Sequence, residues 1–274
     1  MELNDTPPGA AAWLSPAADW PAGVRAVFTT RQGGCSAAPY DSLNLGSHVG
    51  DEAERVSRNR QLLAAEAGVR PVFLNQVHGT EVVQLTPDTP DGVTADACWT
   101  DAPGLACTVM VADCLPLLFA APDGSSVAAV HAGWRGLAGQ GQPGGQGVIE
   151  ALCRHWPAAA SAAQRRALRV WLGPCIGPQV FEVGAEVRAA FLATDPAAAN
   201  CFVALRAEGK FLANLPALAR RRLMALGMEQ VTGNDGSAPW CTVAQASRFF
   251  SHRRDAGRFG STGRMAGLIW RGGA

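Results

Sequence analysis

The sequence lacks several features that would place it in a membrane, secreted or nucleic-acid-binding class. It has no run of about 18 uncharged apolar residues, the length that a membrane-spanning helix needs. Its first residues, MELNDTPPGAAAWLSPAADW, carry no basic segment followed by an apolar one, so we expect no secretory signal. Lys+Arg and Asp+Glu are both 23, and this balance gives no basic surplus for binding nucleic acid or an anionic membrane. We therefore predict a cytoplasmic protein with neither partner.

The eight cysteines form no CxxC pair and are spread over the chain. In a cytoplasmic protein such cysteines are buried thiols, metal ligands or nucleophiles rather than a disulfide framework. With 48% hydrophobic and 17% charged residues, the composition is that of a folded globular chain. The 274 residues show no internal repeat and no linker, which predicts one domain over residues 1–274, with the N-terminal ~20 residues loosely ordered.

Apolar runs and turn residues predict alternating strands and helices, hence an α/β fold of mixed β-sheets flanked by helices. Several runs are apolar at consecutive positions, as in strands covered on both faces. We expect strands at residues 24–30, 71–78, 81–85, 95–100, 104–114, 115–120, 126–132, 168–173 and 265–270. We expect helices at residues 148–156, 184–193 and 214–227, and one more that follows Asp51.

The first predicted helix has Asp51 as its cap, Val56, Leu62 and Leu63 as apolar positions, and Gly68 as its end. Further along, GWRG (residues 133–136) reads as a turn. The glycine-rich residues 136–147 read as a flexible loop or a poorly formed helix start.

Three segments share one pattern, an apolar strand that ends in a residue able to bind a metal. They are VFLNQVHG (72–79), CTVMVADC (107–114) and AAVHAGWRG (128–136). If these strand ends converge, His78, Cys114 and His131 supply two imidazoles and one thiolate. Three such ligands suit a catalytic zinc, whose fourth position stays open. Taken singly, each residue is more often structural, and the spacing leaves both interpretations open.

Arginine and amide side chains occur beside glycine in several loops. Arg31 begins the RQGG loop, Arg60 follows Asn59 on the first predicted helix, Arg135 follows Trp134, and residues 248–264 are rich in arginine. A guanidinium group matches phosphate oxygens with paired hydrogen bonds, although each arginine could equally be a solvated surface charge. Asn44 and Gln76 suit hydrogen bonds to a base or sugar, and Asn44 could instead close its own turn.

The motifs together resemble the laccase-domain family, which includes proteins called purine nucleoside phosphorylases, polyphenol oxidases and a peptidoglycan editing factor. The matching segments span residues 24–270 and include FTTRQGGCS, SLNLGSHVGD, NQVHGTEV, VADCLPLLFA, AAVHAGWRG, LGPCIGPQVFEVG and FFSHRRDAGRFGSTGR. The resemblance implies an α-β-β-α layered fold and a zinc ion on His78, Cys114 and His131. It also implies phosphorolysis of adenosine, inosine, guanosine and methylthioadenosine, with adenosine deamination as a companion activity.

On this basis we predict a monomeric enzyme whose partners are a nucleoside and phosphate. The predicted catalytic residues are the three metal ligands and Arg60, which would hold phosphate, and the predicted substrate-binding residues are Asn44, Gln76, Arg31 and Arg135. Cys175 in GPCIG replaces a small residue of the family pattern and is not expected to be an essential nucleophile.

Three other interpretations stay open. One is a copper-dependent phenol oxidase, against which stand the absence of any HxH motif and a total of five histidines. Another is a hydrolase of amide bonds in peptidoglycan precursors, with Cys114 as a nucleophile beside His131. The third is a binding module without catalytic activity, which the gathering of polar residues at strand ends disfavours.

Overall fold

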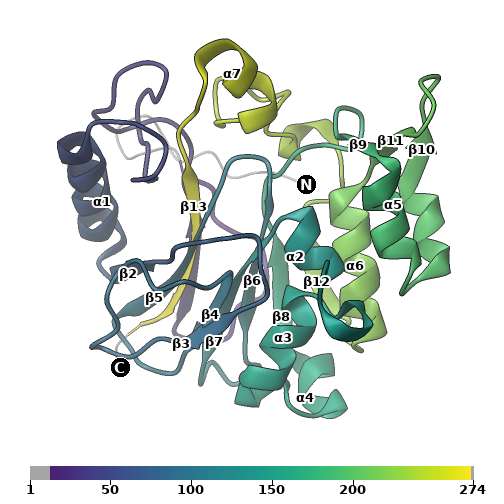
Figure 1. Cartoon of the computed structure of the whole chain (residues 1–274). Helices are drawn as coiled ribbons and strands as arrows, with labels where there is room; N and C mark the ends of the chain where they lie inside the picture. The colour runs from purple at the N-terminus through teal and green to yellow at the C-terminus, as the bar shows by residue number, and fades with distance from the viewer. Residues whose placement is uncertain (1–12, 273–274) are drawn as a thin grey trace.

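Three β-sheets organise residues 13–272, the part of the chain that the computed structural model describes (Figure 1). The first sheet has the order β1-β13-β5-β2, with strands Val24–Phe28, Met265–Arg271, Leu105–Val111 and Arg70–Phe73. The second has the order β12-β8-β6-β7-β4-β3, with strands Gln230–Gly233, Arg169–Leu172, Leu115–Ala120, Val127–Ala132, Ala97–Thr100 and Val82–Gln84. A small third sheet has the order β10-β11-β9, with strands Phe202–Ala204, Lys210–Ala213 and Glu182–Gly184.

Both larger sheets are mixed, as the sequence predicts. In the four-stranded sheet β2 and β5 run parallel, while β13 is antiparallel to β1 and β5. In the six-stranded sheet the outer pairs β12–β8 and β3–β4 are parallel, and the central pairs are antiparallel.

The two larger sheets pack face to face, and helices cover their outer faces. Val109, Leu118, Ala129 and Ile269 are fully buried in the core between the sheets. Helix α1 (Ala53–Ala67) covers the four-stranded sheet through Leu63. Helices α3 (Val148–His155), α5 (Ala185–Leu192) and α6 (Leu215–Ala225) cover the six-stranded sheet on the other side (Figure 1). The α-β-β-α layering is therefore confirmed.

The strand predictions succeed where apolar residues follow one another without a break. Every residue of β5, β6 and β7 is buried, because each strand has a sheet or helices on both faces. Shorter or more polar elements carry no such signal and were missed: β9 to β12, and the helices α2 (Trp134–Ala138), α4 (Ala162–Ala167) and α7 (His252–Phe259).

Helix α1 confirms its predicted end and corrects its predicted beginning. Gly68 follows the helix at φ 62°, the left-handed conformation that ends many helices. The N-cap residue is Glu52, and Asp51 instead accepts hydrogen bonds from the Glu52 amide, Ser36 and Asn44. Leu62, one of the predicted apolar positions, does not face the core: it is 37% exposed, whereas Asn59 is buried.

The segment GWRG, predicted as a turn, forms the N-cap and the first turn of a short helix that the sequence did not predict. Gly133 is the extended N-cap of α2, which ends at Ala138. The glycine-rich stretch then forms the connection to α3, which begins only at Val148, so the helix start is displaced as the glycines suggested.

Most of the N-terminal segment that we predicted to be loosely ordered, residues 1–12, lies outside the described residues. Within the described part, Leu14 is buried and forms a β-bridge with Phe28. None of the helices in residues 13–272 is long and apolar enough to cross a bilayer.

Candidate metal centre

His78, Cys114 and His131 converge, and their ligand atoms all lie within 4.8 Å of one another. The Sγ of Cys114 is 3.6 Å from Nε2 of His78, and the two imidazole rings lie with their centroids 4.8 Å apart. Each residue comes from a different element. His131 lies within β7, Cys114 lies in the turn by which the chain passes from β5 in one sheet to β6 in the other, and His78 lies in the loop after β2. The centre thus sits where the two sheets are joined.

Asp96, which the sequence analysis did not single out, orients two of the three ligands. Its Oδ1 lies 2.7 Å from Nδ1 of His131, which leaves Nε2 of that ring for a metal. The same carboxylate accepts hydrogen bonds from the backbone amides of Val77 (3.2 Å), His78 (2.9 Å) and Gly79 (2.7 Å). His78 has φ 61°, a conformation that is costly for a residue with a Cβ. The Asp96 carboxylate therefore holds the QVHG loop in a strained shape.

Two glycines of HAGWRG allow the backbone of α2 to approach this loop. A Cβ on Gly133 would lie 2.6 Å from Cδ2 of His78 and 3.2 Å from Sγ of Cys114. A Cβ on Gly136 would lie 2.6 Å from the carbonyl oxygen of Gly79. The backbone thus passes close to the ligands.

Cys114 and His131 form an electrostatically coupled pair. Burial alone would raise the pKa of the Cys114 thiol, but the charge of His131 and hydrogen bonds with both histidines outweigh it and lower that pKa to about 6. Burial would lower the pKa of His131, but the Cys114 thiolate and the Asp96 carboxylate raise it to about 9. Without a metal, the pair is a thiolate beside an imidazolium at neutral pH.

The three ligands fit a metal ion. Two imidazole nitrogens, one thiolate and a carboxylate behind one imidazole form a familiar donor set with its orienting partner, and three protein ligands leave a position for water or substrate. Within residues 13–272 no other group of histidine, cysteine and acidic side chains has this geometry.

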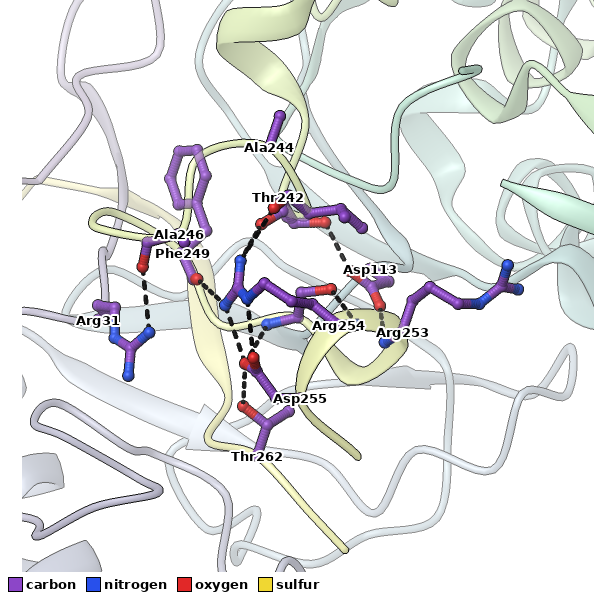
Figure 2. A network of polar contacts seen from close by, with 12 residues as sticks. Arg31, Asp113, Thr242, Ala244, Ala246, Phe249, Arg253, Arg254, Asp255 and Thr262 are labelled. Carbon is purple, nitrogen blue, oxygen red and sulfur yellow. Dashed lines mark hydrogen bonds and ion pairs between the residues drawn. The ribbon is translucent and has the colours of Figure 1, made fainter. Parts of the chain in front are cut away.

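Asp113, next to Cys114, links the turn between β5 and β6 to the C-terminal segment through hydrogen bonds. It adopts φ 94°, and its carboxylate accepts 2.6 Å hydrogen bonds from the Thr242 hydroxyl and from the Arg253 amide at the start of α7. Figure 2 shows both contacts, with the side chain of Arg253 extending away from them.

Within α7, Arg254 and Asp255 form an ion pair that connects the helix to the segments before and after it (Figure 2). Arg254 donates to both oxygens of Asp255 and to the carbonyl oxygens of Thr242, Val243 and Phe249. Asp255 also accepts from the Thr262 hydroxyl. The arginine-rich segment is therefore held together by its own hydrogen bonds, and it packs next to the turn that carries Cys114.

A cavity of about 430 Å³ opens beside the three ligands. This volume lies within the range of small-molecule sites, roughly 300–1,000 Å³. Besides the ligands, its walls comprise His48, Gln76, Met110, Val111, Ala112, Asp113, Arg135, Ile176, Phe181, His252, Arg253 and Arg264.

Of the predicted substrate-binding residues, Gln76 and Arg135 line this cavity. The amide of Gln76 is bonded to β5, donating to the Met110 carbonyl (2.8 Å) and accepting from the Met110 amide (2.7 Å). The guanidinium of Arg135 lies over the ring of Trp134, 4.7 Å from its centroid.

Arg60 and Arg31 lie in other hollows. Arg60 lines a larger hollow of about 790 Å³ beside α1, where it pairs with Asp91 and stacks on Phe73. Arg31 pairs with Asp41 and donates to the Ala246 carbonyl (Figure 2). The structure thus does not bring these two arginines into the cavity beside the ligands, and the roles predicted for them stay predictions.

Asn44 is fully buried and lies outside the cavity walls. Its Oδ1 accepts from the amides of Gly46 and Arg264, both at 2.9 Å, and its Nδ2 donates to the Gly46 carbonyl and to Asp51. The amide therefore closes its own turn, the second of the two interpretations that the sequence allowed.

Sequence reasoning missed Asp96, His48 and Arg264. A histidine that binds a metal needs a hydrogen-bond acceptor for its second nitrogen. The position of Asp96 directly before a buried strand could have identified it as that acceptor. Arg264 belongs to the arginine-rich segment 248–264, but no local sequence feature distinguishes it from the other arginines of that segment.

Comparison with known proteins identifies the family of this chain. Residues 25–272 match the family model described as multi-copper polyphenol oxidoreductase laccase. The chain belongs to this family.

Members of the family match over nearly their whole length. A purine nucleoside phosphorylase of Pseudomonas aeruginosa is 47% identical, with 94% of this chain and 98% of the relative covered. A protein of the same name from Escherichia coli K12 is 45% identical over 91% and 95%. Among solved structures, a Neisseria meningitidis protein is 43% identical with a TM-score of 0.82, covering 95% of this chain and 99% of that one. One from Bacillus licheniformis is 30% identical, also at 0.82, over 98% and 99%.

Proposed function

We propose that this protein is a zinc-dependent purine nucleoside phosphorylase that also deaminates adenosine. The convergence of His78, Cys114 and His131 beside a cavity of nucleoside size carries the proposal. The names of the P. aeruginosa and E. coli relatives support it. Adenosine, inosine, guanosine and methylthioadenosine are the proposed substrates, and the cytoplasm is the proposed location.

In phosphorolysis, a phosphate oxygen forms a bond to C1′ of the ribose while the bond from C1′ to the purine N9 breaks. The purine leaves with the electron pair and takes up a proton, and ribose 1-phosphate is the second product. Positive charge develops on the sugar in the transition state, so the enzyme must hold an anion beside it and accommodate the departing base. Cationic and hydrogen-bonding side chains of the cavity, Gln76, Arg135 and Arg264 among them, are suited to these tasks.

In deamination, water adds at C6 of adenosine and ammonia leaves, giving inosine. A zinc ion held by these three ligands would lower the pKa of a coordinated water molecule to about 7, so that hydroxide becomes available at neutral pH. Asp96 keeps Nδ1 of His131 engaged, so Nε2 faces the ligand position. The two reactions share one nucleoside site but differ in the nucleophile.

The decisive experiment is a panel of the four nucleosides assayed with and without phosphate, with free base and deaminated nucleoside separated chromatographically. We expect free base only when phosphate is present, and inosine from adenosine in both conditions. Release of base at the same rate without phosphate would contradict phosphorolysis.

Metal dependence is tested with Cys114→Ala, compared with Cys35→Ala, which removes an exposed thiol elsewhere. We expect Cys114→Ala to lose bound metal and both activities, whereas Cys35→Ala keeps them. A Cys114→Ala protein that retains both metal and full phosphorolysis would refute the proposal. Metal analysis of protein purified without added metals separates zinc from the copper named in the family description.

A second candidate is a hydrolase in which Cys114 attacks an amide carbonyl, as in editing of peptidoglycan precursors. The lowered pKa of Cys114 beside His131 favours it, because the thiolate is the nucleophilic form. The two candidates differ in their response to zinc, which would occupy the thiolate and inhibit the hydrolase but activate the phosphorylase.

A further inference from the structure

Arg264 is a partly buried cation of the cavity wall whose charge no carboxylate of residues 13–272 neutralises by an ion pair. Its Nη1 donates to the carbonyl oxygens of Thr262 (2.9 Å) and Gly263 (3.3 Å). Its Nε and Nη2 make no hydrogen bond within the described part of the chain. Two of the three nitrogens of this desolvated guanidinium are thus left for a ligand.

Other desolvated arginines of the chain are satisfied by the protein itself. Arg222 pairs with Glu150, and Arg254 pairs with Asp255. Arg220 forms no ion pair within residues 13–272 but donates to the four carbonyl oxygens of Val231, Thr232, Gly233 and Asn234. Leaving a buried charged group unpaired costs free energy. The unpaired guanidinium of Arg264 therefore indicates that an anion binds to it.

The negative groups near Arg264 are already engaged. Among the described residues that line the cavity, Asp113 is the one carboxylate, against three arginines. Both its oxygens accept hydrogen bonds, from Thr242 and from the Arg253 amide. The other negative group, the Cys114 thiolate, faces His78 and His131. Burial lowers the pKa of Arg264, and the nearby Cys114 and Asp113 counteract this only in part.

Two residues of the LNLG motif hold Arg264 in place. The Oδ1 of Asn44 accepts a hydrogen bond from the Arg264 amide, 220 residues away in the sequence. Gly46 leaves room for the side chain, since a Cβ there would lie 2.7 Å from Cγ of Arg264. The motif thus positions the arginine and contributes no group of its own to the cavity.

His48, two residues beyond Gly46, lines the same cavity and makes no hydrogen bond to any residue of 13–272. Burial lowers the pKa of His48, and the charges of Arg264 and Arg60 lower it further. Its imidazole therefore has an N–H donor to offer to the cavity that the guanidinium also lines.

We propose that Arg264, together with His48, forms an oxyanion subsite of the cavity that binds a tetrahedral phosphate group. The planar fork of a guanidinium matches two phosphate oxygens, and a neighbouring imidazole N–H serves a third. If the proposed function holds, the ligand is the inorganic phosphate that attacks the ribose. The same chemistry would recognise the phosphate of a nucleotide.

The test compares Arg264→Gln and the milder Arg264→Lys with the matched variant Arg220→Gln, all loaded with zinc. At saturating inosine we expect Arg264→Gln to raise the KM for phosphate by about 10-fold or more, with a smaller change for Arg264→Lys. The KM for inosine should stay near its wild-type value in both. Arg220→Gln should leave the phosphate KM unchanged. Arg60→Gln is assayed beside them, and an increase in phosphate KM confined to Arg60→Gln would overturn the proposal.

Binding is measured separately from turnover, by the ³¹P linewidth of inorganic phosphate and of inosine monophosphate, with zinc-loaded and metal-free protein. Broadening lost in Arg264→Gln and kept in Arg220→Gln supports the subsite, and the ligand affected identifies free or nucleotide phosphate as its source. Equal broadening in wild type and Arg264→Gln contradicts it. A protein that binds phosphate through Arg264 but cleaves no nucleoside would refute the proposed function and leave the subsite standing.

Discussion

The Oδ1 of Asp96 lies 2.7 Å from Nδ1 of His131, and both side chains are buried. The same carboxylate accepts hydrogen bonds from backbone amides of the loop that carries His78, so one acidic group sets the position of two ligands. Histidine ligands of metals commonly have such a partner, which fixes the tautomer and the ring orientation. Asp96 is therefore a positioning residue of the candidate metal centre.

We expect Asp96→Asn to weaken metal binding by about 10- to 100-fold, because the substitution removes the charge that orients His131. Competition with a chromogenic chelator measures the affinity. Asp195→Asn, which alters an acidic residue paired with Arg221 away from the centre, is the control and should bind metal normally. Unchanged metal affinity in Asp96→Asn would show that the loop geometry suffices without the carboxylate.

Gly133→Ala should damage the centre while leaving most of the fold intact. The added Cβ would lie 2.6 Å from Cδ2 of His78, and that ring cannot move without losing its place among the ligands. We expect a clear loss of bound metal with little change in the far-UV circular dichroism. Gly257→Ala, at a helical position where a Cβ meets nothing within 4 Å, is the matched control. Normal metal content in both variants would contradict the close approach.

The reactivity of Cys114 should depend on pH in a way that an ordinary cysteine does not. With its pKa lowered to about 6, the thiolate fraction in metal-free protein rises as the pH passes from 5 to 7. We expect alkylation of Cys114, followed by peptide mass spectrometry, to reach half its maximal rate near pH 6. Added zinc should suppress it, and labelling of the exposed Cys35 is the internal control. A half-maximal rate above pH 8 would show that His131 does not stabilise the thiolate.

The Arg254–Asp255 pair should stabilise the fold at neutral pH and not in acid. Burial would raise the pKa of Asp255, but the hydrogen bonds from Arg254 and its other partners outweigh it and lower that pKa below its ordinary value. A carboxyl whose pKa is lowered in the folded state contributes stability above its unfolded pKa, and this contribution is lost as the pH falls through the folded value.

We therefore expect Asp255→Asn to reduce the free energy of unfolding at pH 7 by about 1–3 kcal/mol. The difference from wild type should shrink below pH 4. Urea denaturation at both pH values checks this, with the exposed Asp88→Asn as control. A difference of the same size at pH 3 would mean that the charge of Asp255 is not the cause.

Much of the fold follows from local patterns. The uninterrupted apolar runs of β5, β6 and β7 predict strands buried on both faces, and Gly68 predicts the end of α1, because each depends on residues close in sequence. Motif order and strand-end residues were enough to nominate His78, Cys114 and His131, which the structure brings within 4.8 Å of one another.

The partners of these ligands were decided only by the tertiary structure. Asp96 contacts His131 across 35 residues, and Asn44 contacts Arg264 across 220, through packing that no local period records. The sequence alone does not show which arginine reaches the metal ligands. Arg60, on α1, stacks on Phe73, whereas Arg264 lines the cavity beside the ligands. Residue types and strand runs determine which chemistry the chain can perform. The face-to-face packing of two sheets, and the turn at Cys114 that joins them, decide which side chains take part, because only that packing brings distant segments to one place.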